Sequence, residues 1–290
     1  RESWTGSARS WGITVSSGAG TMDILANIVS SCGILRNSNM ATKVLGVGLI
    51  GNGYWGSILA QCLNGRNDFE LLHIADSKYL LDQICNDSRI DLVIIATPNR
   101  THYQLTMEFL RAGKHVLVEK PMCFSASEVE AITELSRQNN LHVITDYTQT
   151  FSPSLQFIAS GKTGIGEIRA FDLSVAKLGT LSEDQNIYWL MVPHLFSILD
   201  MFGSIDKFTF HPLTLRCDMG VPSNVLITFS NGYLRSTLDN PKRGYEITLY
   251  GQEGVVSYYS ASKPSLRASY YTRPTTDCTN KTWHFTEDNN

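Results

Sequence analysis

The stretch GLIGNGYWG, residues 48–56, decides how the rest of this sequence is interpreted. Gly51, Gly53 and Gly56 have the spacing G-x-G-x-x-G, which follows a predicted strand and precedes a predicted helix. In a dinucleotide-binding turn the first glycine permits the tight turn and the second lets the backbone approach a pyrophosphate. The third lets the helix pack closely on the strand. A glycine-rich turn without a ligand is the alternative interpretation.

The residues around this stretch alternate between apolar runs and amphipathic segments. Strands are predicted at 43–51, 69–76, 90–98, 115–121 and 141–147, and helices at 57–63, 78–87, 101–113 and 125–140. Ser125 and Glu128 have the spacing of a capping box at the start of the last helix. Nearly apolar strands that alternate with helices form a parallel sheet covered on both faces, so the fold class is α/β.

The pattern changes after about residue 150. A helix at 152–161, a strand at 167–178 and a helix at 195–203 precede several short strands. Asn231-Gly232 lies between two of these strands and predicts a hairpin. This half is therefore predicted to be an α+β unit with an antiparallel sheet.

Three segments are expected from these patterns. Residues 1–39, rich in Ser and Gly, form an N-terminal extension of uncertain origin, and Met40 is a candidate natural start. Residues 40–150 form the α/β domain that contains the glycine-rich turn. Residues 151–290 form the α+β domain.

Composition excludes several classes of protein. The net charge of −3 gives no basic field that would attract nucleic acid or anionic lipid. The six cysteines include no CxxC pair, so neither a metal site nor a disulfide framework is predicted, and a reducing cytoplasmic location is expected. No run approaches the roughly 20 apolar residues of a membrane-spanning helix, so no membrane association is expected.

Asp76 ends the second predicted strand, 20 residues after Gly56. A carboxylate there can accept hydrogen bonds from an adenosine ribose and would repel a 2′-phosphate, which favours NAD over NADP. Lys78 lies two residues further along the chain and could weaken this preference for NAD. A solvated aspartate at a strand end is the alternative.

Two further segments follow strands of the predicted sheet, where carboxyl ends line a ligand crevice. ATPNRTHY, residues 96–103, offers Thr97, Pro98, Asn99 and His102 as a cofactor wall. The alternative for His102 is a first-turn helix residue that contacts no ligand.

VEKPM, residues 118–122, places Glu119 and Lys120 at the end of the fourth strand. A partly desolvated lysine there could have a lowered pKa or polarise a substrate oxygen. Pro121 could fix this geometry through a cis peptide. An exposed ion pair is the alternative.

These segments, in this order and spacing, resemble the Gfo/Idh/MocA family, which includes glucose–fructose oxidoreductase and inositol dehydrogenase. The resemblance continues through FSPSLQFIASGKTGIGEI, the segment around His194 and NPKRGYEITLYGQEGVVSYY, and so covers about residues 43–260. The YWG and PKR elements look most like the branch that acts on nucleotide-linked or amino sugars.

The resemblance implies that residues 40–150 are a Rossmann domain that binds NAD or NADP. It implies that residues 151–290 are an α+β domain for substrate binding and oligomerisation, with a large, open, mostly antiparallel sheet. It implies reversible hydride transfer between NAD, or alternatively NADP, and a hydroxyl carbon of a sugar or sugar derivative. Lys120 and His194 match the family's residues that serve the hydroxyl proton. A homodimer or homotetramer through the open sheet is also implied. The expected cofactor site consists of Gly51, Asn52, Gly53, Tyr54, Trp55, Gly56, Asp76, Thr97, Pro98, Asn99, His102, Glu119 and Lys120.

The sequence departs from the family around His194, in YWLMVPHLF at 188–196. The family pattern runs like W-D-x-x-x-H, but Leu190 stands where the aspartate would be, and Leu195 follows the histidine. The helix thereby loses a carboxylate one turn from the imidazole, where it would orient or stabilise the charged ring. A catalytically weakened or inactive dinucleotide-binding sensor is therefore the alternative function. Other carboxylates that could take its place are Asp146, Asp172 and Asp184.

The chain also ends at Asn290, where relatives usually carry one more helix. We therefore expect the second domain to be truncated at its C-terminus. An enzyme fragment without function is the third interpretation.

Overall fold

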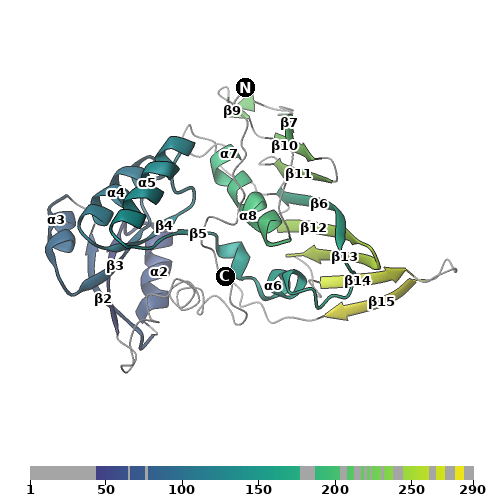
Figure 1. Cartoon of the computed structure of the whole chain (residues 1–290), viewed down its shortest axis with the longest axis horizontal. Helices are drawn as coiled ribbons and strands as arrows, with labels where there is room; N and C mark the ends of the chain where they lie inside the picture. Colours follow the sequence, from purple (N-terminus) through teal and green to yellow (C-terminus); the bar gives the residue numbers. More distant parts are fainter. Residues whose placement is uncertain are drawn as a thin grey trace. The chain divides into compact units, whose positions relative to one another are not determined.

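The computed structural model describes residues 44–64, 66–75, 78–176, 187–202, 208–211, 217–218, 221–222, 224–229, 232–237, 244–260, 266–271 and 278–283. The described residues form two compact units, one ending at Tyr147 and the other beginning at Thr148 (Figure 1). The predicted extension at 1–39 lies outside the described residues. No helix in the described ranges is long and apolar enough to cross a membrane.

The first unit contains a parallel sheet, as the sequence predicts. Its strands are β1 (Leu45–Ile50), β2 (Phe69–Ala75), β3 (Ile90–Ile95), β4 (His115–Glu119) and β5 (Val143–Asp146). They lie in the order β2-β1-β3-β4-β5, and every neighbouring pair is parallel. All six residues of β1 are buried, which is typical of a strand covered on both faces.

Helices cover both faces of this sheet (Figure 1). They are α2 (Tyr54–Asn64), α3 (Lys78–Asn86), α4 (His102–Arg111) and α5 (Ala126–Gln138), with a short 3₁₀ helix, η3 (Asn99–Thr101), before α4. Apolar residues of α3, α4 and α5 pack in one cluster with the sheet, whereas α2 lies on the opposite face. Right-handed crossovers require this arrangement, because the chain moves one way from β1 to β2 and the other way afterwards.

Two helix starts in this unit bear on the sequence predictions. The capping box is confirmed, since the Ser125 hydroxyl accepts a hydrogen bond from the Glu128 amide and the Glu128 carboxylate accepts one from the Ser125 amide. Helix α2 begins at Tyr54, three residues earlier than predicted. The sequence pattern did not predict its first turn. Tyr54 and Trp55 are exposed although they are large aromatic residues, so the apolar positions there do not follow the helical period.

The second unit contains a mixed, mainly antiparallel sheet. The sheet has the order β15-β14-β13-β12-β6-β11-β10-β7, in which only the pair β6–β11 is parallel. Its strands are β6 (Ile168–Ala176), β7 (Phe208–His211), β10 (Asn224–Phe229), β11 (Gly232–Thr237), β12 (Gly244–Gly251), β13 (Gly254–Tyr259), β14 (Leu266–Tyr271) and β15 (Cys278–Trp283). A separate short pair comprises β8 (Cys217–Asp218) and β9 (Val221–Pro222). The predicted α+β class is confirmed.

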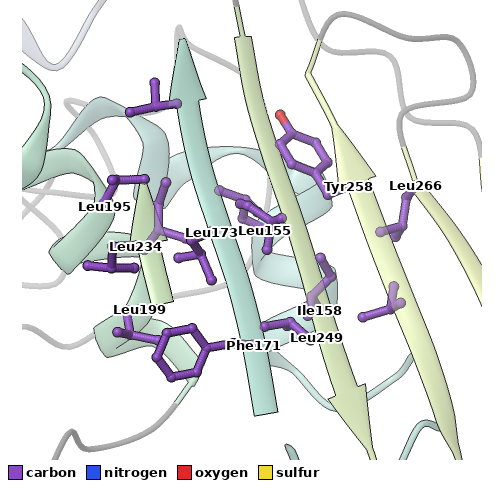
Figure 2. Packing of buried hydrophobic residues seen from close by; sticks show 14 of the residues in the cluster. Leu155, Ile158, Phe171, Leu173, Leu195, Leu199, Leu234, Leu249, Tyr258 and Leu266 are labelled. Carbon is purple, nitrogen blue, oxygen red and sulfur yellow. The ribbon is translucent and has the colours of Figure 1, made fainter. Parts of the chain in front are cut away.

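Helices pack on one face of this sheet. They are α6 (Pro153–Ala159), α7 (Ile187–Leu190) and α8 (Val192–Phe202), and a 3₁₀ helix, η4 (Thr148–Phe151), opens the unit. Figure 2 shows side chains of α6 and α8 against those of β6, β12, β13 and β14 in the main apolar cluster. Helix α8 begins three residues before the prediction. Pro193 lies in its first turn, where the missing N–H needs no partner.

The predicted hairpin is formed by β10 and β11. Phe229 pairs with Gly232, so the strands are joined by residues 230–231, which lie outside the described residues. Gly232 is thus a strand residue instead of a turn residue. A Cβ there would be 2.1 Å from the Phe171 carbonyl oxygen of β6, so the close approach of that strand requires the glycine.

Candidate functional site

The first unit has a switch point between β1 and β3, where the chain turns in opposite directions. The Ala96 amide donates to the Ile50 carbonyl at 2.8 Å, and the Gly51 amide donates to the Ala75 carbonyl at 2.9 Å. The loops that follow β1 and β3 therefore start side by side at the carboxyl edge of the sheet. Ligands of open α/β sheets bind at this position.

The three glycines of the loop after β1 have three different surroundings. Gly51 has φ +95°, and a Cβ there would be 2.5 Å from the Ala96 carbonyl oxygen. A Cβ on Gly56 would be 2.0 Å from the Gly51 carbonyl oxygen. At Gly53 a Cβ would meet nothing within 4 Å. The loop thus has a tight turn, a close helix contact and open space in the middle, as a pyrophosphate-binding turn requires.

The start of α2 borders this open space. Asn52, Gly53, Tyr54 and Trp55 are exposed, Tyr54 at 79%. The two aromatic rings meet edge to face with centroids 5.7 Å apart. Because the first N–H groups of a helix have no partner within the helix, they favour an anion at its N-terminus. The residues present therefore fit the pyrophosphate of a dinucleotide.

Side-chain hydrogen bonds within the loop after β3 stabilise its conformation. The Thr101 hydroxyl donates to the Pro98 carbonyl at 2.8 Å, so its contact with the Thr97 hydroxyl at 2.7 Å has Thr97 as donor. Pro98 is exposed, whereas Thr97 and Asn99 are half-buried. Of the predicted cofactor wall, Pro98 is thus the most accessible residue.

His102 connects the loop after β3 with the loop after β4. Its side chain is fully buried, with Nδ1 2.7 Å from the Pro121 carbonyl oxygen and Nε2 2.8 Å from the Thr97 carbonyl oxygen. Both ring nitrogens are therefore engaged by backbone, one in the loop after β3 and one in the loop after β4. This burial favours the alternative considered from the sequence, a helix residue that contacts no ligand, and a direct contact between His102 and the cofactor stays a prediction.

The end of β4 places an acidic and a basic side chain next to a buried carboxyl group at the end of β5. Glu119 ends β4, and Lys120 follows it with a cis peptide bond to Pro121. Burial, together with the negative charge of Asp146, raises the pKa of Glu119 to about 8 even though Lys120 acts in the opposite direction. Glu119 and Lys120 are both half-buried, which does not match the exposed ion pair considered from sequence.

Asp146 is the residue of this group that sequence reasoning did not place. It ends β5 and is the register partner of Glu119, with 5% of its surface exposed. The signal that could have found it is that both residues end neighbouring parallel strands. Asp76, the predicted ribose contact, lies outside the described residues, as does the side chain of Lys78.

His194 belongs to the second unit and lies in the first turn of α8. Its ring meets the Tyr245 ring edge-on with centroids 6.2 Å apart. Burial raises the pKa of Tyr245 well above its ordinary value, and Tyr258 adds to this. An aromatic, half-buried environment thus surrounds one side of the imidazole.

The expected relation between Leu190 and His194 differs in the structure. Leu190 is the last residue of α7 and His194 belongs to α8, so the two do not lie on one continuous helix. Leu190 packs against the apolar cluster of the second unit. The position that lacks the family's aspartate is therefore a packing position in this chain.

Asp172, one of the candidate replacement carboxylates, does not face α8. Asp172 accepts a hydrogen bond from the Tyr250 hydroxyl at 3.0 Å. Because Leu173, its neighbour in β6, faces α8, Asp172 points to the opposite face of the sheet. Asp146 belongs to the first unit, and Asp184 lies outside the described residues.

Comparison with known families gives a match over the first unit. Residues 45–147 match the GFO_IDH_MocA model, described as an oxidoreductase family with an NAD-binding Rossmann fold. The scyllo-inositol 2-dehydrogenase (NADP(+)) IolW of Bacillus subtilis is 35% identical over 99 residues, which are 31% of this chain and 28% of that protein. The inositol 2-dehydrogenase of Rhizobium meliloti is 28% identical over 138 residues, 42% of each chain. The chain thus matches less than half the length of either curated relative.

A solved structure extends the likeness to both units. A levoglucosan dehydrogenase in complex with NADH and L-sorbose has a TM-score of 0.64 and 17% identity, and the match covers 83% of this chain and 80% of that one. At this identity the likeness shows the fold alone. The combination of a parallel-sheet unit and a mixed-sheet unit is therefore shared.

Proposed function

Because residues 45–147 belong to the Gfo/Idh/MocA family of oxidoreductases, with its NAD-binding Rossmann fold, we propose that this chain is a dehydrogenase of sugars or polyols. It moves a hydride between NAD or NADP and a hydroxyl-bearing carbon of the substrate. The two curated relatives act on inositols, and the solved neighbour was captured with L-sorbose, so cyclic and open polyhydroxylated compounds are the first substrate classes to test.

The observation that carries this proposal is the arrangement of the carboxyl edge of the parallel sheet. The open space at Gly53 and the N-terminus of α2 lie at the switch point. Two strands along, the same edge carries Lys120 beside a buried carboxyl group. A dinucleotide turn and a half-buried lysine at one sheet edge are the parts that nicotinamide-dependent oxidation of an alcohol needs.

A nicotinamide cofactor held at the turn between Gly51 and Gly56 would supply the acceptor for the hydride that leaves the carbon of the substrate. The hydroxyl proton leaves at the same time, and a carbonyl group forms. The Lys120 ammonium donates a hydrogen bond to the reacting oxygen and stabilises the negative charge that develops there. His194 accepts the proton, and its resemblance to the family histidine supports this role.

The alternative of an inactive dinucleotide-binding protein rests on Leu190. The comparisons add no support for it, since they match oxidoreductases. It is therefore kept as an outcome of the test, in which the cofactor binds and no substrate turns over.

Cofactor binding is the first measurement. A ligand at 100 times its dissociation constant stabilises a folded protein by about 2.7 kcal/mol, so NAD or NADP should raise the unfolding temperature measurably. We expect NAD or NADP to raise the unfolding temperature of the wild type, and neither cofactor to raise that of Gly53→Val. An equal lack of shift with both cofactors in the wild type would count against the proposal.

Turnover is the second measurement. NADH or NADPH absorbance is followed with a panel of inositols, aldoses, ketoses and nucleotide-linked sugars. Lys120→Met should abolish any activity, while Lys162→Met, at an exposed lysine of the second unit, should leave it unchanged. No turnover on any member of the panel, despite cofactor binding, would favour the inactive alternative.

We also propose that copies of this chain associate through the open face of the mixed sheet. Tyr250, Tyr259 and Tyr271 alternate with buried neighbours and are exposed at 36%, 38% and 50% on the face away from the helices. Light scattering after gel filtration should report a dimer or tetramer. Tyr259→Arg should reduce that mass, and a monomeric wild type would contradict the proposal.

A further inference from the structure

Two carboxyl groups lie side by side at the carboxyl edge of the parallel sheet. Glu119 ends β4 and Asp146 ends β5, and the two residues are register partners on neighbouring strands. Their side chains therefore leave the sheet on the same face, and Asp146 is 5% exposed while Glu119 is half-buried. Two carboxylates that share a site repel each other when both are ionised, so a proton on one of them relieves the repulsion.

The groups around this pair differ in charge. Among the described residues, Lys120, next to Glu119, is the positively charged neighbour of the pair. Cys62 of α2 lies near Asp146, and burial and the charge of that carboxylate raise the pKa of its thiol. Burial likewise raises the pKa of Tyr147 to about 12, with Cys123 as a further contributor. At neutral pH these thiol and phenol groups are uncharged, so Lys120 is the neighbour that balances the pair.

We propose that Glu119 and Asp146 hold a single proton between them at neutral pH, and that Asp146 is thereby a positioning residue for the charge beside Lys120. With one proton in the pair, the Lys120 ammonium faces one negative charge instead of two. Asp146 acts through Glu119 and needs no contact with substrate. This inference concerns the chain without ligand and rests on the proposed function only in giving Lys120 a role in the reaction.

The consequence for Lys120 follows from the loss of that proton. The pKa of Glu119 lies at about 8, so the pair becomes doubly negative as the pH rises above this value. A second negative charge close to an ammonium group favours its charged form. Lys120 then stays protonated, and so remains a hydrogen-bond donor, more strongly than before. The negative charge at this sheet edge increases by one.

Infrared difference spectroscopy on the full chain without cofactor tests the pair directly. Between pH 6 and pH 9 the wild type should lose the C=O band of a buried carboxylic acid, with a midpoint near pH 8. In Asp146→Asn the midpoint should move down by about one pH unit or more, a tenfold loss of proton affinity, because the repelling charge is gone. Glu119→Gln should remove the band from this window. Glu134→Gln, at an exposed glutamate paired with Arg137, is the control and should leave it unchanged.

Cys62 provides a second readout that does not depend on activity. Its alkylation rate against pH, followed by mass spectrometry, should shift to lower pH in Asp146→Asn because the nearby carboxylate is lost. No such shift, or the absence of a carboxylic acid band that titrates between pH 6 and pH 9, would overturn the inference. Thermal shifts with NAD and NADP are recorded on the same samples. If the pair titrates but neither cofactor binds, the inference stands and the proposed function fails. If a cofactor binds but the pair does not titrate, the proposed function stands and the inference fails.

Discussion

Gly56 of α2 packs directly on Gly51, the residue after β1, where a Cβ at position 56 would be 2.0 Å from the Gly51 carbonyl oxygen. No heavy-atom contact that short is tolerated, and the atom approached is rigid backbone. Gly53, three residues before, is different because a Cβ there would meet nothing within 4 Å. The same motif thus contains one glycine required by the fold and one whose space is available to a ligand.

Substitutions at these two glycines should separate stability from cofactor binding. We expect Gly56→Ala to lower the free energy of unfolding by about 2 kcal/mol or more, through overpacking against backbone. Gly53→Val should change it by less than about 1 kcal/mol and should abolish the thermal shift with NAD or NADP. Urea denaturation and cofactor titration measure the two effects. Cofactor binding that survives in Gly53→Val would place the pyrophosphate elsewhere.

The contacts of His102 with the carbonyl oxygens of Thr97 and Pro121 should contribute measurably to stability. A neutral imidazole donates one hydrogen bond, and His102→Phe leaves the buried carbonyl oxygen that accepts it without this partner, at about 1–3 kcal/mol. We therefore expect a loss of about 1–3 kcal/mol in urea denaturation. His102→Gln, whose amide can still donate, should recover part of it. Equal stability of His102→Phe and the wild type would show that the ring does not join the two loops.

The raised pKa of Glu119 predicts how stability depends on pH. Between its ordinary value of 4.5 and the value of about 8 in the folded chain, the folded state keeps a proton that the unfolded state has lost. This contribution to stability is therefore complete below pH 4.5 and is lost as the pH rises toward 8, by up to about 1.4 kcal/mol for each pH unit. Denaturation at pH 5, 6, 7 and 8 measures the slope.

Other groups titrate in the same range, so the comparison with Glu119→Gln isolates the effect. Burial lowers the pKa of His142, for example, and this makes stability rise with pH up to about 6.5. The difference in stability between Glu119→Gln and the wild type should grow in favour of the variant from pH 5 to pH 8. A difference that stays constant across this range would show that Glu119 ionises as an ordinary exposed glutamate.

Much of the first unit could be predicted from sequence because its signals are local. The apolar strands, the glycine spacing and the pair Ser125–Glu128 each act within a few residues, and the structure has the corresponding strands, turn and capping box. The start of α2 was missed because Tyr54 and Trp55 are exposed there, in contrast to the usual burial of large aromatic residues.

The candidate site contains relations that sequence alone could not give. Glu119 and Asp146 become neighbours through the register of two strands that are 27 residues apart along the chain. His102 contacts Thr97 nearby but also Pro121, which lies in another loop. Such contacts depend on the order and register of the strands, which local patterns do not specify.

The prediction that this chain prefers NAD to NADP depends on Asp76. A carboxylate that binds the adenosine ribose would repel a 2′-phosphate, so the wild type should bind NAD more tightly than NADP. Asp76→Ser removes the charge, and we expect it to weaken NAD binding and to narrow the difference between the two cofactors at least tenfold, or about 1.4 kcal/mol. Thermal shift titrations with both cofactors measure this. A wild type that prefers NADP, with no change in Asp76→Ser, would contradict the assignment.

Leu190 offers the sharpest test of the segment around His194. On the sequence alone, Leu190→Asp should restore a carboxylate one helical turn from the imidazole. In the structure Leu190 ends α7 and packs on the apolar cluster, whereas His194 begins α8. An aspartate there loses apolar contacts and places a charge beside the cluster, so we expect a loss of about 1–3 kcal/mol in unfolding free energy and no gain in turnover.

Leu190→Met is the matched control, because it keeps the apolar volume and should cost less than about 1.5 kcal/mol. Urea denaturation and the substrate panel are applied to both variants. If Leu190→Asp were as stable as Leu190→Met and turned over substrate faster than the wild type, position 190 would face the imidazole, and the missing carboxylate would be the cause of weakened catalysis.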